Sequence, residues 1–172
     1  MKKKIIPILA LVICYSGLFA QANTSFNTYS AVNMNNVSSP QGALIFKVYS
    51  LGKNVADARK RAQRDAVHAI IFQGISGSRY PNPLVSDPSD FTEDKKYWKN
   101  FFGVKDLVSG KPDKKVNPLY LNYVKVPLNY TIDPKDKRKV GGKESVGIVV
   151  EVAYDNLRKK LEADGKVQKL GF

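Results

Sequence analysis

The clearest pattern of apolar and polar positions in the chain is a helical one, over residues 54–75. Small apolar residues return there every three or four positions, at Ala58, Ala62, Ala66 and Ala69. This spacing predicts a long helix whose alanine-rich face lies close to a sheet. Asn54 is suited to cap its first turn, Asp57 suits the positive end of the helix dipole, and Gly74 is a natural break at the other end.

Alternating apolar positions predict strands elsewhere. Residues 43–49 read as one strand, and residues 119–132 and 145–154 are expected to pair as an antiparallel hairpin joined by a polar turn over residues 133–144. Pro127 cannot donate a hydrogen bond to a neighbouring strand, so we expect a bulge or an edge position there. The apolar residues that share a face are Leu44, Phe46 and Val48, then Val124, Val126, Leu128, Tyr130 and Ile132, then Val146, Ile148, Val150, Val152 and Tyr154.

Two shorter helices are predicted. The first covers residues 91–102, where Asp90 and Glu93 have the spacing of a capping box and Gly103 follows the last turn. Its aromatic residues have the spacing of core residues: Phe91, Tyr97, Trp98, Phe101 and Phe102. The second covers residues 155–163, with Asp155 as its cap. A short strand over residues 104–108 lies between these helices in the sequence.

This order of elements predicts an α+β fold. We expect a mainly antiparallel sheet with the long alanine-rich helix and two shorter helices packed on one face. Residues 42–172 form a single domain in this prediction, and residues 21–41, rich in Asn, Ser and Thr, form an extended or disordered leader.

Residues 1–20 are predicted to be a signal peptide. Three lysines at positions 2–4 precede an apolar stretch at 5–13, and small residues around Ala20 and Ala22 allow cleavage after either, with Ala20 preferred. No later stretch is apolar over membrane-spanning length, so no transmembrane segment is expected in the mature chain. The sequence therefore predicts an exported protein, periplasmic or associated with the outer membrane.

Cys14 is the only cysteine. A bacterial lipoprotein signal places a small residue before its cysteine, and the bulky Ile13 argues against a lipid anchor here. Cleavage after Ala20 removes Cys14, and the mature chain then has no disulfide, thiolate nucleophile or cysteine metal ligand. A domain of this size can be stable without such links.

The chain is strongly basic, with a formal net charge of +13 over 172 residues. Removing residues 1–20 with their three lysines leaves 152 residues and a charge of +10. Such a charge favours anionic lipid, glycan or nucleic acid, although basic residues mixed with acids also serve simply as a solubilising surface. Nucleic acid is disfavoured, because exposed aromatic residues do not alternate with the basic ones. The candidate anionic-surface site is the helix face opposite the alanines, predicted to face solvent: Arg59, Lys60, Arg61, Arg64 and His68.

The residues that carry catalysis or bind metals are sparse in this sequence. His68 is the only histidine, and neither a second histidine nor a mature cysteine can complete a zinc site. An acidic group near position 90 suggests either calcium or the negatively charged starts of helices, and we favour the helix starts: Asp87, Asp90, Glu93 and Asp94. We predict no catalytic residue, no metal and no cofactor.

The helix motif resembles a family of uncharacterised exported proteins from gut bacteria. The likeness rests on Ala58, Ala62 and Ala66 followed by residues 67–72 and Gly74, and it extends to the aromatic segment 98–103 and the closing segment 157–172. A more distant likeness is to the small outer-membrane lipoprotein and flagellar-assembly domains of bacterial envelopes. Both resemblances imply an interaction module without active-site residues.

The leading hypothesis is therefore a non-enzymatic protein of the bacterial cell envelope that acts as an interaction module, with its partner unknown. The alternative is a binder of anionic glycan or lipid through the basic helix face. A hydrolase is a third hypothesis, which requires a concave pocket with clustered titratable groups.

Overall fold

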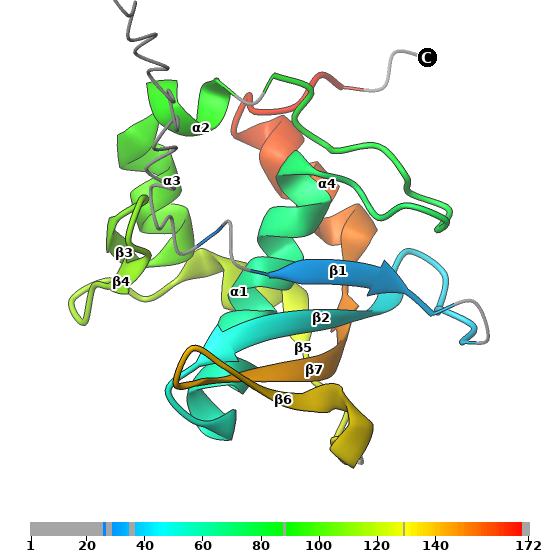
Figure 1. The fold of residues 1–172 in the computed structure, drawn as a ribbon. Helices are drawn as coiled ribbons and strands as arrows, with labels where there is room; N and C mark the ends of the chain where they lie inside the picture. The colour runs from blue at the N-terminus through cyan, green and yellow to red at the C-terminus, as the bar shows by residue number, and fades with distance from the viewer. Residues whose placement is uncertain (1–25, 27–28, 35–36, 88, 129, 170–172) are drawn as a thin grey trace, which may run out of the picture.

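The computed structural model describes residues 26, 29–34, 37–87, 89–128 and 130–169. It has the predicted α+β architecture, with a mainly antiparallel sheet and helices on one of its faces (Figure 1). The predicted signal peptide, its predicted cleavage sites and Cys14 lie outside the described residues, as do Leu170 and Phe172. None of the described helices has the length and apolarity that a membrane span needs.

The sheet has five strands, all antiparallel, in the order β1-β2-β7-β5, with β6 also paired to β7. Their bounds are β1 Ser30–Asn33, β2 Leu44–Gly52, β5 Val124–Lys125, β6 Lys137–Val140 and β7 Lys143–Val152. Val48 lies opposite Ile148 at the centre of the β2–β7 pair. Because side chains alternate along a strand, one face of this pair is largely apolar, as predicted, with Ser50 as a buried polar exception.

The long helix, α1 (Val55–Phe72), packs on that apolar face. Asn54 caps it, since its side-chain oxygen accepts a hydrogen bond from the backbone N–H of Asp57 at 2.9 Å. Ala58, Ala62 and Ala66 are completely buried, which confirms the alanine-rich contact face.

The predicted helix over residues 91–102 is two helices, α2 (Asp90–Glu93) and α3 (Lys95–Phe102). The break falls at Asp94, whose carboxylate accepts from the backbone N–H of Tyr97 at 3.1 Å and so begins a new helix. The expected capping by Asp90 is therefore wrong. Gly103, in the left-handed conformation, ends α3, and the short hairpin of β3 (Val104–Asp106) and β4 (Lys111–Pro112) follows.

The predicted strand over residues 119–132 is wrong for most of its length. Residues 119–123 form a 3₁₀ helix, η1 (Leu119–Tyr123), which buries Tyr120, and Pro127 follows the two-residue strand β5. The hairpin partner of β7 is instead β6, within the segment predicted as a polar turn. A turn of Gly141 and Gly142, both with positive φ, joins them.

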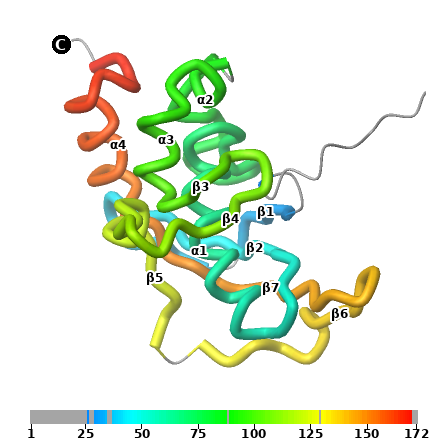
Figure 2. Tube along the Cα trace, turned by 90° about the vertical axis from the view of Figure 1, so that its left-hand side faces the viewer, coloured from blue at the N-terminus to red at the C-terminus, as the bar shows by residue number. Residues whose placement is uncertain are grey.

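The connection from β5 to β6 crosses the face of the sheet away from the helices (Figure 2). Tyr130 donates from its hydroxyl to the carbonyl oxygen of Gly147 at 3.0 Å. Asp136, in the second 3₁₀ helix η2 (Pro134–Asp136), accepts from Lys47 at 2.6 Å and from Tyr49 at 2.7 Å. These bonds hold the connection against β2 and β7.

The remaining elements close the helical side. α4 (Tyr154–Ala163) follows β7 directly and buries Leu157 and Leu161, with Ala153 rather than Asp155 at the cap position. Part of the predicted leader belongs to the domain, because β1 pairs with β2 and Phe26 is buried in the core.

Candidate functional site

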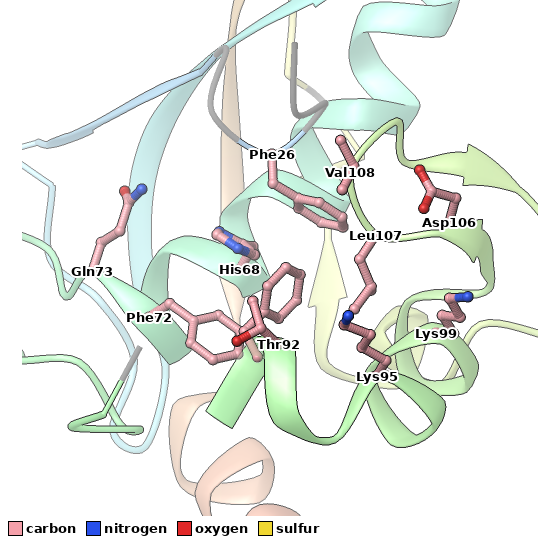
Figure 3. A pocket seen from close by; sticks show the side chains of 11 residues that line it. Phe26, His68, Phe72, Gln73, Thr92, Lys95, Lys99, Asp106, Leu107 and Val108 are labelled. Carbon is pink, nitrogen blue, oxygen red and sulfur yellow. The ribbon is translucent and has the colours of Figure 1, made fainter. Parts of the chain in front are cut away.

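A pocket of about 600 Å³ with largely apolar walls lies beside the C-terminal half of α1 (Figure 3). The α1 helix and its C-cap form one side, α2 and α3 the second, and the β3–β4 turn the third. Its lining residues are Phe26, His68, Phe72, Gln73, Phe91, Thr92, Lys95, Lys99, Asp106, Leu107 and Val108.

Aromatic rings surround His68 at the deep end of this pocket. The Phe26 ring stacks on the imidazole with 4.6 Å between centroids, and Phe91 meets it edge-on at 5.2 Å. Phe72 lies 5.0 Å from His68 and 4.8 Å from Phe91. Such close, varied ring contacts give a rigid apolar wall.

His68 is buried, with 6% of its surface exposed, so its expected position on a solvent-facing basic face is wrong. Its Nδ1 and the hydroxyl of Tyr29 share a hydrogen bond of 2.7 Å. Burial, with a smaller contribution from Arg64, lowers the pKa of His68 from 6.5 to about 3. The imidazole is therefore neutral at neutral pH.

Arg64 is also buried, again contrary to the predicted solvent face. Its guanidinium donates to the Asp65 carboxylate at 2.7 and 3.0 Å and to the carbonyl oxygen of Gly110 at 3.2 Å. It also lies over the ring of Phe26, 4.5 Å from the centroid. Because Gly110 lies at the turn of the β3–β4 hairpin, Arg64 holds two walls of the pocket.

Asp65 completes this buried polar group. Its second carboxylate oxygen accepts from the hydroxyl of Ser50 on β2 at 2.7 Å. Burial raises the pKa of Asp65, while Arg64 and Ser50 act in the opposite direction. The sheet, α1 and the pocket hairpin are thus linked through one pair of neighbouring residues.

The two incorrect predictions on α1, that His68 and Arg64 face solvent, have the same physical cause. The α2–α3 layer and Phe26 cover the side of the helix that the sequence pattern left polar. His68 contacts Phe91 at 5.2 Å and Phe102 at 5.9 Å, and Arg64 lies over Phe26. Arg59 and Lys60 remain exposed, and Arg61 pairs with Asp57 at 3.1 Å. The structure therefore does not bring the five predicted residues together on one surface.

Lysines from α3 line the outer part of the pocket. Lys95 and Lys99 are one helical turn apart, and Figure 3 shows them with Asp106 on the side away from Phe72 and Gln73. Within the described part of the chain, neither lysine forms an ion pair. Hydrogen bonds from Ser109, with help from Lys99, hold the pKa of Asp106 below its usual value, so this carboxyl is charged.

The acidic residues near position 90 have structural partners within the protein. Asp94 caps α3, and Lys166 pairs with both Asp94 at 2.7 Å and Asp90 at 3.7 Å. Asp87 accepts from the backbone N–H of Ser89 at 2.8 Å. Among the described residues, no group of three or more histidine, cysteine, aspartate or glutamate side chains is placed to hold a metal ion.

The pocket could be predicted only in part. The spacing of Lys95 and Lys99 beside the aromatic residues of α3 was a readable signal for a basic rim. The position of Phe26 could not be predicted, because this residue comes from a polar stretch and reaches the pocket through tertiary contacts.

No family model matches the chain, and no curated protein or solved structure is significantly similar to it. The resemblance to exported proteins of gut bacteria thus stays a prediction.

Proposed function

We propose that this protein is a non-enzymatic, exported binding module of the bacterial cell envelope, and that its pocket holds a long-chain carboxylic acid. The observation that carries the proposal is an apolar, aromatic pocket whose outer part has two lysines without ion-pair partners among the described residues. The apolar part fits an acyl chain, and the lysines fit its carboxylate.

The size of the pocket supports a small-molecule ligand. A volume of about 600 Å³ lies within the range of about 300–1,000 Å³ that is usual for such sites. Phe72, Phe91 and Leu107 supply apolar area, and burying that area is the main favourable term for an acyl chain.

The charges support an anionic head group. Lys95 and Lys99 together exceed the single charge of Asp106, so this side of the pocket has a net positive charge. Because His68 at the deep end is neutral, it does not oppose the burial of an apolar chain beside it. These features favour binding and orientation of an amphipathic ligand over proton transfer.

The test is titration of the full mature chain with a dansyl-labelled long-chain fatty acid, followed by fluorescence. Lys95→Glu with Lys99→Glu should weaken binding about tenfold or more, because both cations become anions beside the carboxylate. Lys114→Glu with Lys115→Glu is the matched control, since it makes the same change in net charge at exposed positions that do not line the pocket. It should leave the affinity within about twofold.

A second test, which does not depend on charge, fills the pocket with a larger side chain. Val108 lines the pocket and is half exposed, so Val108→Trp adds bulk without disturbing the core. We expect it to abolish binding with an unchanged melting temperature. Equal affinity of the wild type for the fatty acid and the corresponding alcohol would contradict the role of the lysines. Retained binding by the tryptophan variant would place the ligand elsewhere.

A further inference from the structure

A second basic surface lies at the end of the sheet where β2 leads into α1. Gly52, the last residue of β2, pairs with Glu144, and Val140 pairs with Lys143 at the tip of the β6–β7 hairpin. This register brings the hairpin tip to the same end of the sheet as Lys53, just before the α1 cap (Figure 1). The surface, which we call the hairpin tip, comprises Lys53, Lys137, Arg138, Lys139, Val140 and Lys143.

The cations of the hairpin tip are exposed and uncompensated. All four residues of β6 are exposed, and so are Lys53 and Lys143. Among the described residues, none of these cations forms an ion pair. Glu144 is the one acid within the paired segment, and Asp136 nearby is occupied by Lys47 and Tyr49. The surface thus concentrates positive charge at one place in the molecule.

An exposed apolar residue lies among these charges. Val140 is 50% exposed, and as the partner of Lys143 it shares a face of the hairpin with Lys143 and Arg138. The adjoining glycines, Gly141 and Gly142, have positive φ and open space on their side-chain positions. The tip therefore presents a half-exposed valine on the same face as two cations.

Two readings of this arrangement compete. Lysines on an edge strand protect it from pairing with other chains, and charge alone along β6 would meet that need. An exposed valine at the tip does not help such protection. Cations around a protruding apolar residue are instead suited to a membrane interface, where the cations meet lipid phosphates and the apolar group enters the acyl boundary.

We propose that the hairpin tip docks this protein on an anionic lipid membrane. Arg138, Lys139 and Lys143 contact the head groups, and Val140 enters the interface. This site is separate from the α3 pocket and does not depend on its ligand. It also replaces the α1 face as the basic surface of interest, because two of the five residues predicted there are buried.

The test is co-sedimentation of the mature chain with vesicles of phosphatidylcholine, alone or mixed with phosphatidylglycerol. Binding should require the anionic lipid and weaken as salt is raised. Arg138→Glu with Lys143→Glu should lower the affinity about tenfold or more. Lys114→Glu with Lys115→Glu makes the same change in net charge at exposed positions elsewhere and should cost less than about threefold.

Val140→Ser removes the apolar side chain without changing the charge of the hairpin tip. Because Val140 is half exposed, the change should leave the fold intact. It should lower vesicle affinity several-fold while leaving the binding of soluble dextran sulfate unchanged. Equal losses in the two charge-reversed variants would overturn the proposal in favour of non-specific attraction. Dextran sulfate binding as strong as vesicle binding, with no effect of Val140→Ser, would overturn it in favour of an anionic glycan. Val108→Trp should bind vesicles like the wild type, so a failed pocket leaves this test intact.

Discussion

At the scale of single residues, the buried pair of Arg64 and Asp65 has the greatest influence on the rest of the molecule. Both side chains are more than nine-tenths buried, on a helix whose other buried residues are alanine, valine, isoleucine and His68. Taking such charges out of water is costly unless each is paired and hydrogen-bonded. Ser50, Gly110 and the Phe26 ring complete that pairing, so the pair fixes where the sheet, the helix and the pocket hairpin meet.

Asp65→Ala is expected to destabilise the fold by about 3–5 kcal/mol, because it leaves the Arg64 guanidinium buried without its carboxylate. Urea unfolding followed by circular dichroism measures this free energy. Arg61→Ala is the control on the same helix, since it removes only a pair with Asp57 that is about one-third exposed and should cost less than about 1 kcal/mol. Similar losses in both variants would mean that the buried ion pair stabilises the fold no more than the exposed one.

His68 is expected to make stability fall in mild acid. Its folded pKa of about 3 lies below the usual 6.5, so between these values the unfolded chain binds a proton that the folded chain does not. Stability should therefore decrease by about 1.4 kcal/mol per pH unit as the pH falls below 6.5 towards 3. Unfolding at pH 7 and pH 5 should show a loss of about 2 kcal/mol that His68→Phe removes.

Tyr29→Phe is the control for this titration, because it removes the hydrogen-bond partner and keeps the imidazole buried. It should lower stability at both pH values and retain the slope. If the free energy of unfolding changed with pH in the same way for the wild type and His68→Phe, the assignment of a neutral, buried histidine would be wrong.

At the scale of elements, α1 shows how much a local pattern can predict. Its cap, its length and its alanine face follow from local spacing, and the same holds for the buried faces of β2 and β7. The opposite side of α1 was read as solvent-facing because Lys60, Arg61 and Arg64 are charged. A single helix pattern does not reveal that a second layer covers one half of the helix.

Ala62→Leu or Ala66→Leu should each destabilise the protein by about 1–3 kcal/mol, since neither side chain has room to grow against the sheet. Thermal unfolding measures the loss. Ala56→Leu is the control, because Ala56 is exposed on the same helix and leucine is a good helix former there. Unchanged melting of both core variants would place this face of α1 away from the sheet.

The errors of prediction concentrate in the segment from Leu119 to Val140. Alternating apolar residues there gave a strand pattern, but Pro127 limits β5 to two residues, and the following apolar residues cover the far face of the sheet instead. The pairing of β6 depends on the Gly141–Gly142 turn, which the basic composition of the segment concealed. Most of the pocket could not be predicted for a related reason, because its walls come from separate parts of the chain.

At the scale of the whole molecule, the sheet separates two different environments. The helices and the aromatic core occupy one face, and the connection between β5 and β6 crosses part of the other (Figure 2). That connection is fastened by Asp136, where Lys47 and Tyr49 of β2 converge. Gly147 on β7 permits this approach, because a β-carbon there would lie 2.7 Å from Tyr49 and 3.0 Å from Asp136.

Asp136→Asn should destabilise the protein by about 1–3 kcal/mol at neutral pH, by weakening two hydrogen bonds to a charged acceptor. Burial alone raises the pKa of Asp136, but the bonds from Lys47 and Tyr49 outweigh it, and the net pKa lies below 3.8. The stabilisation is thus complete above pH of about 4 and is lost as the pH falls through the lower folded pKa.

Unfolding measured at pH 7 and below pH 4 checks this prediction, and the difference between the wild type and Asp136→Asn should shrink in acid. Glu151→Gln is the control on the same strand pair, since its partner Lys125 is largely exposed and the change should cost less than about 1 kcal/mol at pH 7. A difference that is constant with pH would show that the carboxylate charge is not what fastens the connection.

The pairing of β2 with β7 also dictates when the molecule can become compact. Leu44 meets Val152, so the central pair joins positions near the two ends of the domain. A chain that emerges N-terminus first, from a ribosome or through a membrane pore, has formed α1 long before the strand that completes the surface beneath it. Until Val152 has emerged, the alanine face has only half of its sheet. Because such distant contacts form slowly, the nascent chain remains open during its passage and closes only when almost all of it is free.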